Sequence, residues 1–105
     1  MTFTLYHNNN CSKSRLCKSI LEKKKIKIEI REYIKKPLTL DEIQELYVNL
    51  DGEKNKVFRK TPPILGKKDL IKYLFENQNL MQRPIFFNGD KYIICRPPEL
   101  VLELI

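Results

Sequence analysis

Cysteine and histidine are scarce in this sequence of 105 residues, which has three cysteines and one histidine. A small, odd set of cysteines is not the framework of a disulfide-rich secreted protein. His7 has no close pair of cysteine or histidine ligands around it, so we expect no metal site. Each of the three thiols is therefore expected to be either a nucleophile or a packing residue.

Long apolar runs are also missing. No run could span a bilayer, and none near the first residue is typical of a signal peptide. We therefore expect a cytoplasmic protein without a membrane partner. There are no internal repeats and no low-complexity linker, and 42% of the residues are hydrophobic. This length and composition favour a single domain, 1–105, with one modest core.

Acidic residues are outnumbered, with 13 Asp and Glu against 20 Lys and Arg and a formal net charge of +7. Residues 1–36 carry ten of the cations and only three acids. The plain interpretation is a solvated lysine-rich face. The alternatives are an electrostatic funnel for an anionic substrate and a nucleic-acid patch. Few aromatic residues lie among these lysines, which argues against nucleic acid as a partner.

The first third of the chain predicts a strand, a helix and a second strand. Residues 2–6 alternate and are rich in strand formers, whereas residues 7–10, a histidine and three asparagines, favour a loop. A stripe of apolar residues at helical spacing predicts a helix over about 12–24, with Ser12 as its cap. Isoleucines then alternate with charged residues, which predicts a strand over about 26–33.

The rest of the chain predicts helices first and a hairpin afterwards. Thr39 and Glu42 form a capping box for a helix that ends near 50–52. Residues 53–66 favour a loop or irregular helix, and a further helix is expected over about 67–78. Asn88-Gly89 is a strong hairpin signal between strands at 84–87 and 91–94. Consecutive prolines suit the start of a final helix over about 97–104.

This order is a βαβ unit followed by a ββα unit, which is the thioredoxin topology. We therefore predict an α/β, thioredoxin-like fold with a helical insertion over about 38–80 between its two halves.

Cys11 is the residue best placed for chemistry. It follows a strand and a loop and stands at a helix start, where unpaired N–H groups and a partial positive charge stabilise a thiolate. The thiolate is the reactive form of cysteine. Arg15 lies one helical turn on and His7 lies on the loop before Cys11, so we expect a lowered pKa for the Cys11 thiol.

Several segments resemble the ArsC family of arsenate reductases. Residues 6–15, YHNNNCSKSR, resemble its nucleophile loop, His-Asn-Pro-x-Cys-x-x-Ser-Arg. Downstream, RPI at 83–85 and CRPPE at 95–99 resemble its Arg-Pro-Ile and Gly/Cys-Arg-Pro-x-Glu segments. VFRK at 57–60 is similar to its middle Leu/Phe-Arg-Lys segment. The segments occur in the family's order over nearly the whole chain.

The resemblance implies a thiol oxidoreductase that reduces arsenate, or a similar oxyanion, to arsenite. Cys11 would be the nucleophile, three arginines would hold the oxyanion, and three further residues would tune the thiolate; the arginines are Arg59, Arg83 and Arg96, and the tuning residues are His7, Ser14 and Arg15. Guanidinium groups suit this role because they stay charged and donate in planar forks. The family uses glutathione as co-substrate and glutaredoxin as partner, with no bound cofactor.

Two more expectations concern packing and backbone. Cys17 lies on the apolar helix stripe and Cys95 ends a strand, so both are interpreted as structural thiols. Because thioredoxin-like proteins place a cis proline opposite the active cysteine, we predict a cis bond before Pro84. Arg83 and Arg96 flank the two strands of one hairpin, so their side chains can reach one point.

Two functions of other classes stay open. One is a transcription regulator like the Spx proteins, which share this fold and carry a Cys-x-x-Cys switch; here Cys11 and Ser14 occupy those positions. The other is a module of the same fold that binds thiols without catalysis. A nucleic-acid-binding domain has no support beyond charge.

Overall fold

The computed structural model describes residues 3–105 and has the predicted thioredoxin-like architecture. Its sheet has the strand order β2-β1-β3-β4. The strands are β1 (Phe3–His7), β2 (Ile28–Glu32), β3 (Ile85–Phe87) and β4 (Tyr92–Ile94). β1 is parallel to β2, and β3 is antiparallel to both β1 and β4. Thr2, where the predicted first strand begins, lies outside the described residues.

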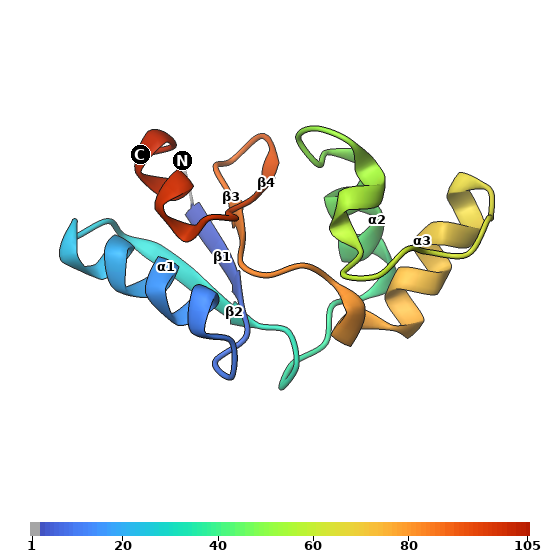
Figure 1. Cartoon of the computed structure of the whole chain (residues 1–105), viewed down its shortest axis with the longest axis horizontal. Helices are drawn as coiled ribbons and strands as arrows, with labels where there is room; N and C mark the ends of the chain where they lie inside the picture. Colours follow the sequence, from blue (N-terminus) through green and yellow to red (C-terminus); the bar gives the residue numbers. More distant parts are fainter. Residues whose placement is uncertain (1–2) are drawn as a thin grey trace.

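One face of the sheet is covered by α1 (Ser12–Lys23) and the 3-10 helix η3 (Pro98–Glu103), which pack against each other (Figure 1). The core under them consists of Leu5, Cys17, Leu21, Phe86, Cys95 and Val101. Cys17 and Cys95 are both fully buried there, as expected for structural thiols, and all three cysteines are free.

The helical insertion lies beside the sheet and builds a second core (Figure 1). It consists of α2 (Leu40–Val48), η1 (Lys54–Val57), α3 (Lys67–Glu76) and η2 (Gln78–Leu80). Its core joins Ile43, Leu46 and Leu74 to Ile85 and Tyr92 of the sheet. The insertion is therefore anchored on the hairpin strands by buried apolar contacts.

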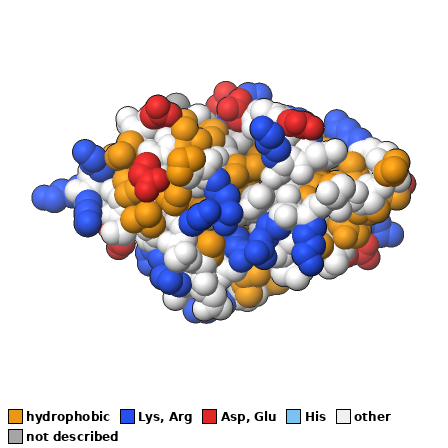
Figure 2. Space-filling view, viewed as in Figure 1, with side chains coloured by type: hydrophobic (Ala, Val, Ile, Leu, Met, Phe, Trp, Pro, Cys, Tyr) orange, Lys and Arg blue, Asp and Glu red, His pale blue; other side chains and the backbone are white. Residues whose placement is uncertain are grey.

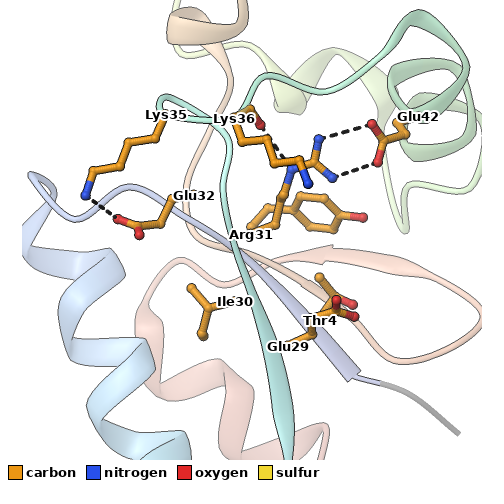
Figure 3. A pocket seen from close by; sticks show the side chains of 9 residues that line it. Thr4, Glu29, Ile30, Arg31, Glu32, Lys35, Lys36 and Glu42 are labelled. Atoms are coloured by element: carbon orange, nitrogen blue, oxygen red, sulfur yellow. Dashed lines mark hydrogen bonds and ion pairs between the residues drawn. The ribbon is translucent and has the colours of Figure 1, made fainter.

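A bidentate ion pair ties β2 to the insertion (Figure 3). Arg31 Nη1 and Nη2 donate to the two carboxylate oxygens of Glu42 over 2.8 and 3.2 Å. Glu42 also completes the predicted capping box, because Thr39 N–H donates to Glu42 Oε1 and Glu42 N–H donates to Thr39 Oγ1. One carboxylate thus fixes both the start of α2 and its attachment to the sheet.

Replacing Glu42 by alanine should lower the free energy of unfolding by about 1–2 kcal/mol, the size of a lost cap plus a partly exposed ion pair. Burial raises the pKa of Glu42, but Arg31 and Thr39 outweigh it and lower the pKa. The contribution is therefore present above the ordinary carboxyl pKa and is lost as the pH falls through the lowered one. Urea unfolding at pH 7 and pH 3 measures both effects. Glu45→Ala, on an exposed position of the same helix, is the control and should change little.

The helices differ from the sequence-based expectations in several places, and α2, expected to end near 50–52, ends at Val48. Cys11, not Ser12, is the cap residue of α1, and no side chain bonds the first turn. The helix predicted to reach 78 ends at Glu76. The final helix is 3-10, with Leu100 N–H bonded to the Pro97 carbonyl and Leu104 N–H to the Val101 carbonyl. It is only six residues long, and such short pieces favour the tighter i→i+3 pattern.

No helix within residues 3–105 has the length and apolar character needed to cross a membrane.

Candidate active site

Sheet topology brings four chain segments to one end of the sheet. β1 and β2 are parallel and end side by side, with His7 opposite Glu32. β3 is antiparallel to β1, so it begins at this end, and β4 ends there, with Ile94 opposite Ile85. The loop before α1, the turn after β2, the segment before β3 and the segment after β4 therefore meet.

Cys11 stands in the first of these segments, at the amino end of α1. Its backbone is extended, with φ −100° and ψ 121°, its N–H donates to the Asn8 carbonyl, and its own carbonyl accepts from Arg15 N–H. The residue is 9% exposed, so the thiol is sheltered but reachable. The local sequence thus turns the thiol toward the unpaired N–H groups of the helix start.

The surroundings of Cys11 favour its thiolate. Burial raises the pKa of the thiol, but the backbone N–H groups of Ser14 and Lys13 and the guanidinium of Arg83 lower it, and the net pKa lies below the ordinary value. The first-turn N–H groups and a fixed cation are the two features that activate cysteines in proteins. Cys11 therefore has the electrostatics of a nucleophile.

Arg96 and Arg83 both reach this thiol. Arg96 Nη2 lies 3.9 Å from Cys11 Sγ, and Arg96 Nε donates to the Arg83 carbonyl over 2.9 Å. Both residues are half-buried. The bond before Pro84 is cis, which confirms the prediction, and the bond before Pro97 is cis as well. Two positive forks from the ends of one hairpin thus converge on one sulfur.

His7 and Ser14 form a buried pair beneath the loop. His7 Nδ1 lies 2.6 Å from Ser14 Oγ, Asn8 N–H donates to that same Oγ over 3.1 Å, and His7 Nε2 lies 3.4 Å from Asn9 Oδ1. Asn9 Oδ1 can only accept, so the proton belongs on Nε2 and the Ser14 hydroxyl donates to Nδ1. Burial lowers the pKa of His7, which keeps the ring neutral at neutral pH.

This pair changes the role expected for Ser14. Its hydroxyl proton is committed to His7, so the backbone N–H of Ser14, rather than its side chain, favours the Cys11 thiolate. His7 holds the loop that carries Cys11 in place through its contacts with Ser14 and Asn9. The sequence alone does not show which Ser14 donor faces the thiol, because that depends on the hydrogen bond with His7.

Arg15 and Arg59, the remaining arginines predicted for the site, lie at the protein surface. Arg15 is exposed, and its Nη1 donates to the Asn9 carbonyl over 2.8 Å, so it braces the loop. Arg59 is also exposed. The insertion brings it near the site through a bridge between Phe58 and Met81, two residues before Arg83. Its charge lowers the pKa of Tyr33, which lies at the same end of the sheet.

Tyr33 is a site residue that the sequence analysis missed. It directly follows β2 and is 1% exposed. Three buried side-chain atoms within residues 3–105 have no hydrogen-bond partner, namely Tyr33 OH, Arg83 Nε and Gln82 Oε1. A lone tyrosine after a strand carries no sequence signal, because only the parallel pairing of β1 and β2 places it beside the Cys11 loop.

The pocket shown in Figure 3 is elsewhere, along β2. It measures about 490 Å³, and its charged side chains largely pair with one another: Arg31 with Glu42, and Lys35 with Glu32. Its lining contains no cysteine and includes neither Arg83 nor Arg96. The reactive group of the described chain is thus at the end of the sheet.

Comparison with known proteins shows which family the chain belongs to. The model of the ArsC family matches residues 6–104. The chain belongs to the ArsC family. An arsenate reductase of Haemophilus influenzae is 35% identical over 116 aligned positions, which cover 100% of both chains. An arsenate reductase of Escherichia coli is 29% identical, covering 97% of this chain and 79% of its own. The structure of an arsenate reductase from Vibrio cholerae superposes with a TM-score of 0.88 at 28% identity, covering 100% of this chain and 98% of that one.

The ArsC family match spans every residue of the thiol site, from His7 to Arg96.

The three thiols of this ArsC chain should differ sharply in reactivity. Iodoacetamide should label Cys11 first at pH 6–7, because its pKa is lowered, and the rate should level off at a lower pH than for a free thiol. Cys17 and Cys95 are fully buried, and a thiol hydrogen bond to Cys17 together with burial raises the pKa of Cys95. Peptide mass spectrometry after timed labelling measures all three. Faster labelling of Cys17 or Cys95 at pH 6 would show that the nucleophile is misassigned.

Proposed function

We propose that this protein is a cytoplasmic thiol oxidoreductase that reduces arsenate, or a similar tetrahedral oxyanion, to arsenite. The observation that carries the proposal is the convergence of Arg83 and Arg96 on a Cys11 thiol with a lowered pKa. A dianion needs several fixed donors, and guanidinium groups provide charge and hydrogen bonds together. The names of the relatives from Haemophilus influenzae and Vibrio cholerae support arsenate as the substrate.

In the first step, the Cys11 thiolate attacks the arsenic of bound arsenate. A sulfur–arsenic bond forms, and an arsenic–oxygen bond breaks as the oxygen leaves as water after taking up protons. Arg83 and Arg96 hold the remaining oxygens and offset their negative charge as the thiolate approaches. No electrons have moved to arsenic by the end of this step, and arsenic remains As(V).

In the second step, a glutathione thiolate attacks the sulfur of Cys11. A disulfide forms between Cys11 and glutathione, the sulfur–arsenic bond breaks, and its electron pair stays on arsenic, which leaves as arsenite, As(III). Glutaredoxin then takes the glutathione from this mixed disulfide and restores the Cys11 thiolate by thiol–disulfide exchange. Glutathione is thus a co-substrate, and the proposal includes no bound cofactor or metal.

The positive surface supports an anionic substrate. Lys and Arg side chains gather across the middle of the face in Figure 2, between the sheet and the helical insertion of Figure 1. A cleft or face of one sign raises the local concentration of oppositely charged ligands and their association rate. Both arsenate and glutathione carry net negative charge at neutral pH, so the same field favours both.

A coupled assay tests the proposal. The protein is mixed with arsenate, glutathione, glutaredoxin, glutathione reductase and NADPH, and NADPH loss is followed at 340 nm. Arsenate-dependent loss that grows with protein concentration is the expected result. Without it, and with glutathione nevertheless bound to Cys11, the chain is a non-catalytic thiol-binding module. Phosphate and sulfate in place of arsenate should give no turnover and serve as controls.

A further inference from the structure

The structure leaves two hydrogen-bond donors unpaired beside the Cys11 thiol. The Tyr33 hydroxyl and Arg83 Nε are both buried, and neither donates to an acceptor among residues 3–105. Tyr33 is 1% exposed, so its hydroxyl is shielded from bulk water. Buried polar groups are nearly always paired, and each exception needs an explanation. Two unpaired donors at one reactive sulfur call for a ligand that accepts.

The sheet places both donors at the thiol. Tyr33 follows Glu32, the last residue of β2, and Glu32 lies opposite His7 at the end of β1. The chain continues from His7 into the loop that carries Cys11. Arg83 precedes β3 at this same end of the sheet. The arrangement is therefore set by strand pairing and does not depend on a mobile surface side chain.

Charge determines which way the Tyr33 hydrogen bond runs. Burial raises the pKa of the phenol, Arg83 lowers it through its charge and as a donor toward the phenol oxygen, and Cys11 raises it, so that the net pKa lies above the ordinary value. The phenol is therefore protonated at neutral pH and acts as a donor. A guanidinium can only donate, so the phenol proton is left without an acceptor.

Resting on the function proposed above, we propose that the Tyr33 hydroxyl and Arg83 Nε donate together to one oxygen of the tetrahedral oxyanion at Cys11. The oxyanion would give both orphaned donors a partner, which the protein itself does not provide. Arg83 is half-buried, so its guanidinium can turn to admit an oxygen. Tyr33 adds a neutral, directional donor to the charged arginines.

Tyr33→Phe tests this proposal, because it removes only the hydroxyl and keeps the buried ring. The probe is sulfate, an unreactive tetrahedral oxyanion, at constant ionic strength. The readout is the sulfate concentration that halves the rate of Cys11 alkylation by iodoacetamide. We expect this concentration to rise at least about tenfold, as for a lost hydrogen bond to a charged group. Tyr47→Phe removes a hydroxyl from a tyrosine that is 5% exposed in the same core and should leave the value unchanged.

Two further readouts separate an oxyanion donor from a structural residue. The Tyr33 hydroxyl has no partner to lose, so Tyr33→Phe should not lower the melting temperature. The pH midpoint of Cys11 alkylation should also stay in place, because Arg83 remains beside the thiol. A raised midpoint would show that Tyr33 only positions Arg83 and would overturn the proposal, as would wild-type protection by sulfate in the variant. Failure of sulfate and of arsenate to protect the wild-type protein would instead overturn the proposed function itself.

Discussion

Arsenate turnover should fall to background, on the order of 10³-fold or more, when Cys11 is replaced by serine. The serine hydroxyl has nearly the same size, but it is not ionised at neutral pH and cannot pass an electron pair to arsenic. The coupled NADPH assay measures the loss. Cys11 is 9% exposed at the edge of the core, so the melting temperature should change little.

Cys17→Ala is the matched control for this variant. Cys17 lies in the same helix, α1, but its side chain is fully buried in the core under that helix. The substitution removes one sulfur there and should cost about 1 kcal/mol of stability, with turnover retained below the melting temperature. Retained turnover in Cys11→Ser, or its loss in Cys17→Ala at full folding, would contradict the assignment of the nucleophile.

Removing either hairpin guanidinium should weaken oxyanion binding by about 1.5–3 kcal/mol, the range for a hydrogen bond to a charged group. Arg83→Ala should also raise the pKa of the Cys11 thiol, since Arg83 helps to lower it. The alkylation midpoint then moves to higher pH. Sulfate or arsenate affinity by calorimetry and the alkylation profile measure the two effects in the same preparation.

Two controls separate a fixed fork from bulk positive charge. Lys91→Ala removes one cation from the exposed tip of the same hairpin and should change anion affinity little. Arg96→Lys keeps the charge but loses the fork that bonds the Arg83 carbonyl, so its affinity should fall clearly below wild type. Unchanged anion affinity in both Arg83→Ala and Arg96→Ala, with normal melting curves, would exclude an oxyanion site at Cys11.

Local rules predicted much of this fold because its signals are short-range. The Thr39 and Glu42 capping box and the Asn88-Gly89 turn need only neighbouring residues, and both capping bonds form as expected. The position of Cys11 at a helix start follows from the strand–loop–helix pattern alone. The approach of Arg83 and Arg96 follows from the geometry of one hairpin.

What the sequence could not supply depends on long-range pairing and on competing hydrogen bonds. Tyr33 becomes a site residue only because β2 pairs with β1, which places the turn after Glu32 beside the Cys11 loop. The Ser14 hydroxyl was expected at the thiol, but His7 holds its proton. Arg15 was expected to tune the thiolate, and in the structure its guanidinium donates to the nearby Asn9 carbonyl.

The central claim is that Cys11 reacts with the oxyanion before it reacts with glutathione. Intact-protein and peptide mass spectrometry test it in a reaction with arsenate and glutathione but without glutaredoxin, so that the mixed disulfide accumulates. The account predicts one glutathione per chain, on Cys11, formed quickly with arsenate and slowly without it, and one arsenite released per disulfide. Glutathione on Cys11 at the same rate with and without arsenate, or glutathione on Cys17 or Cys95, would contradict it.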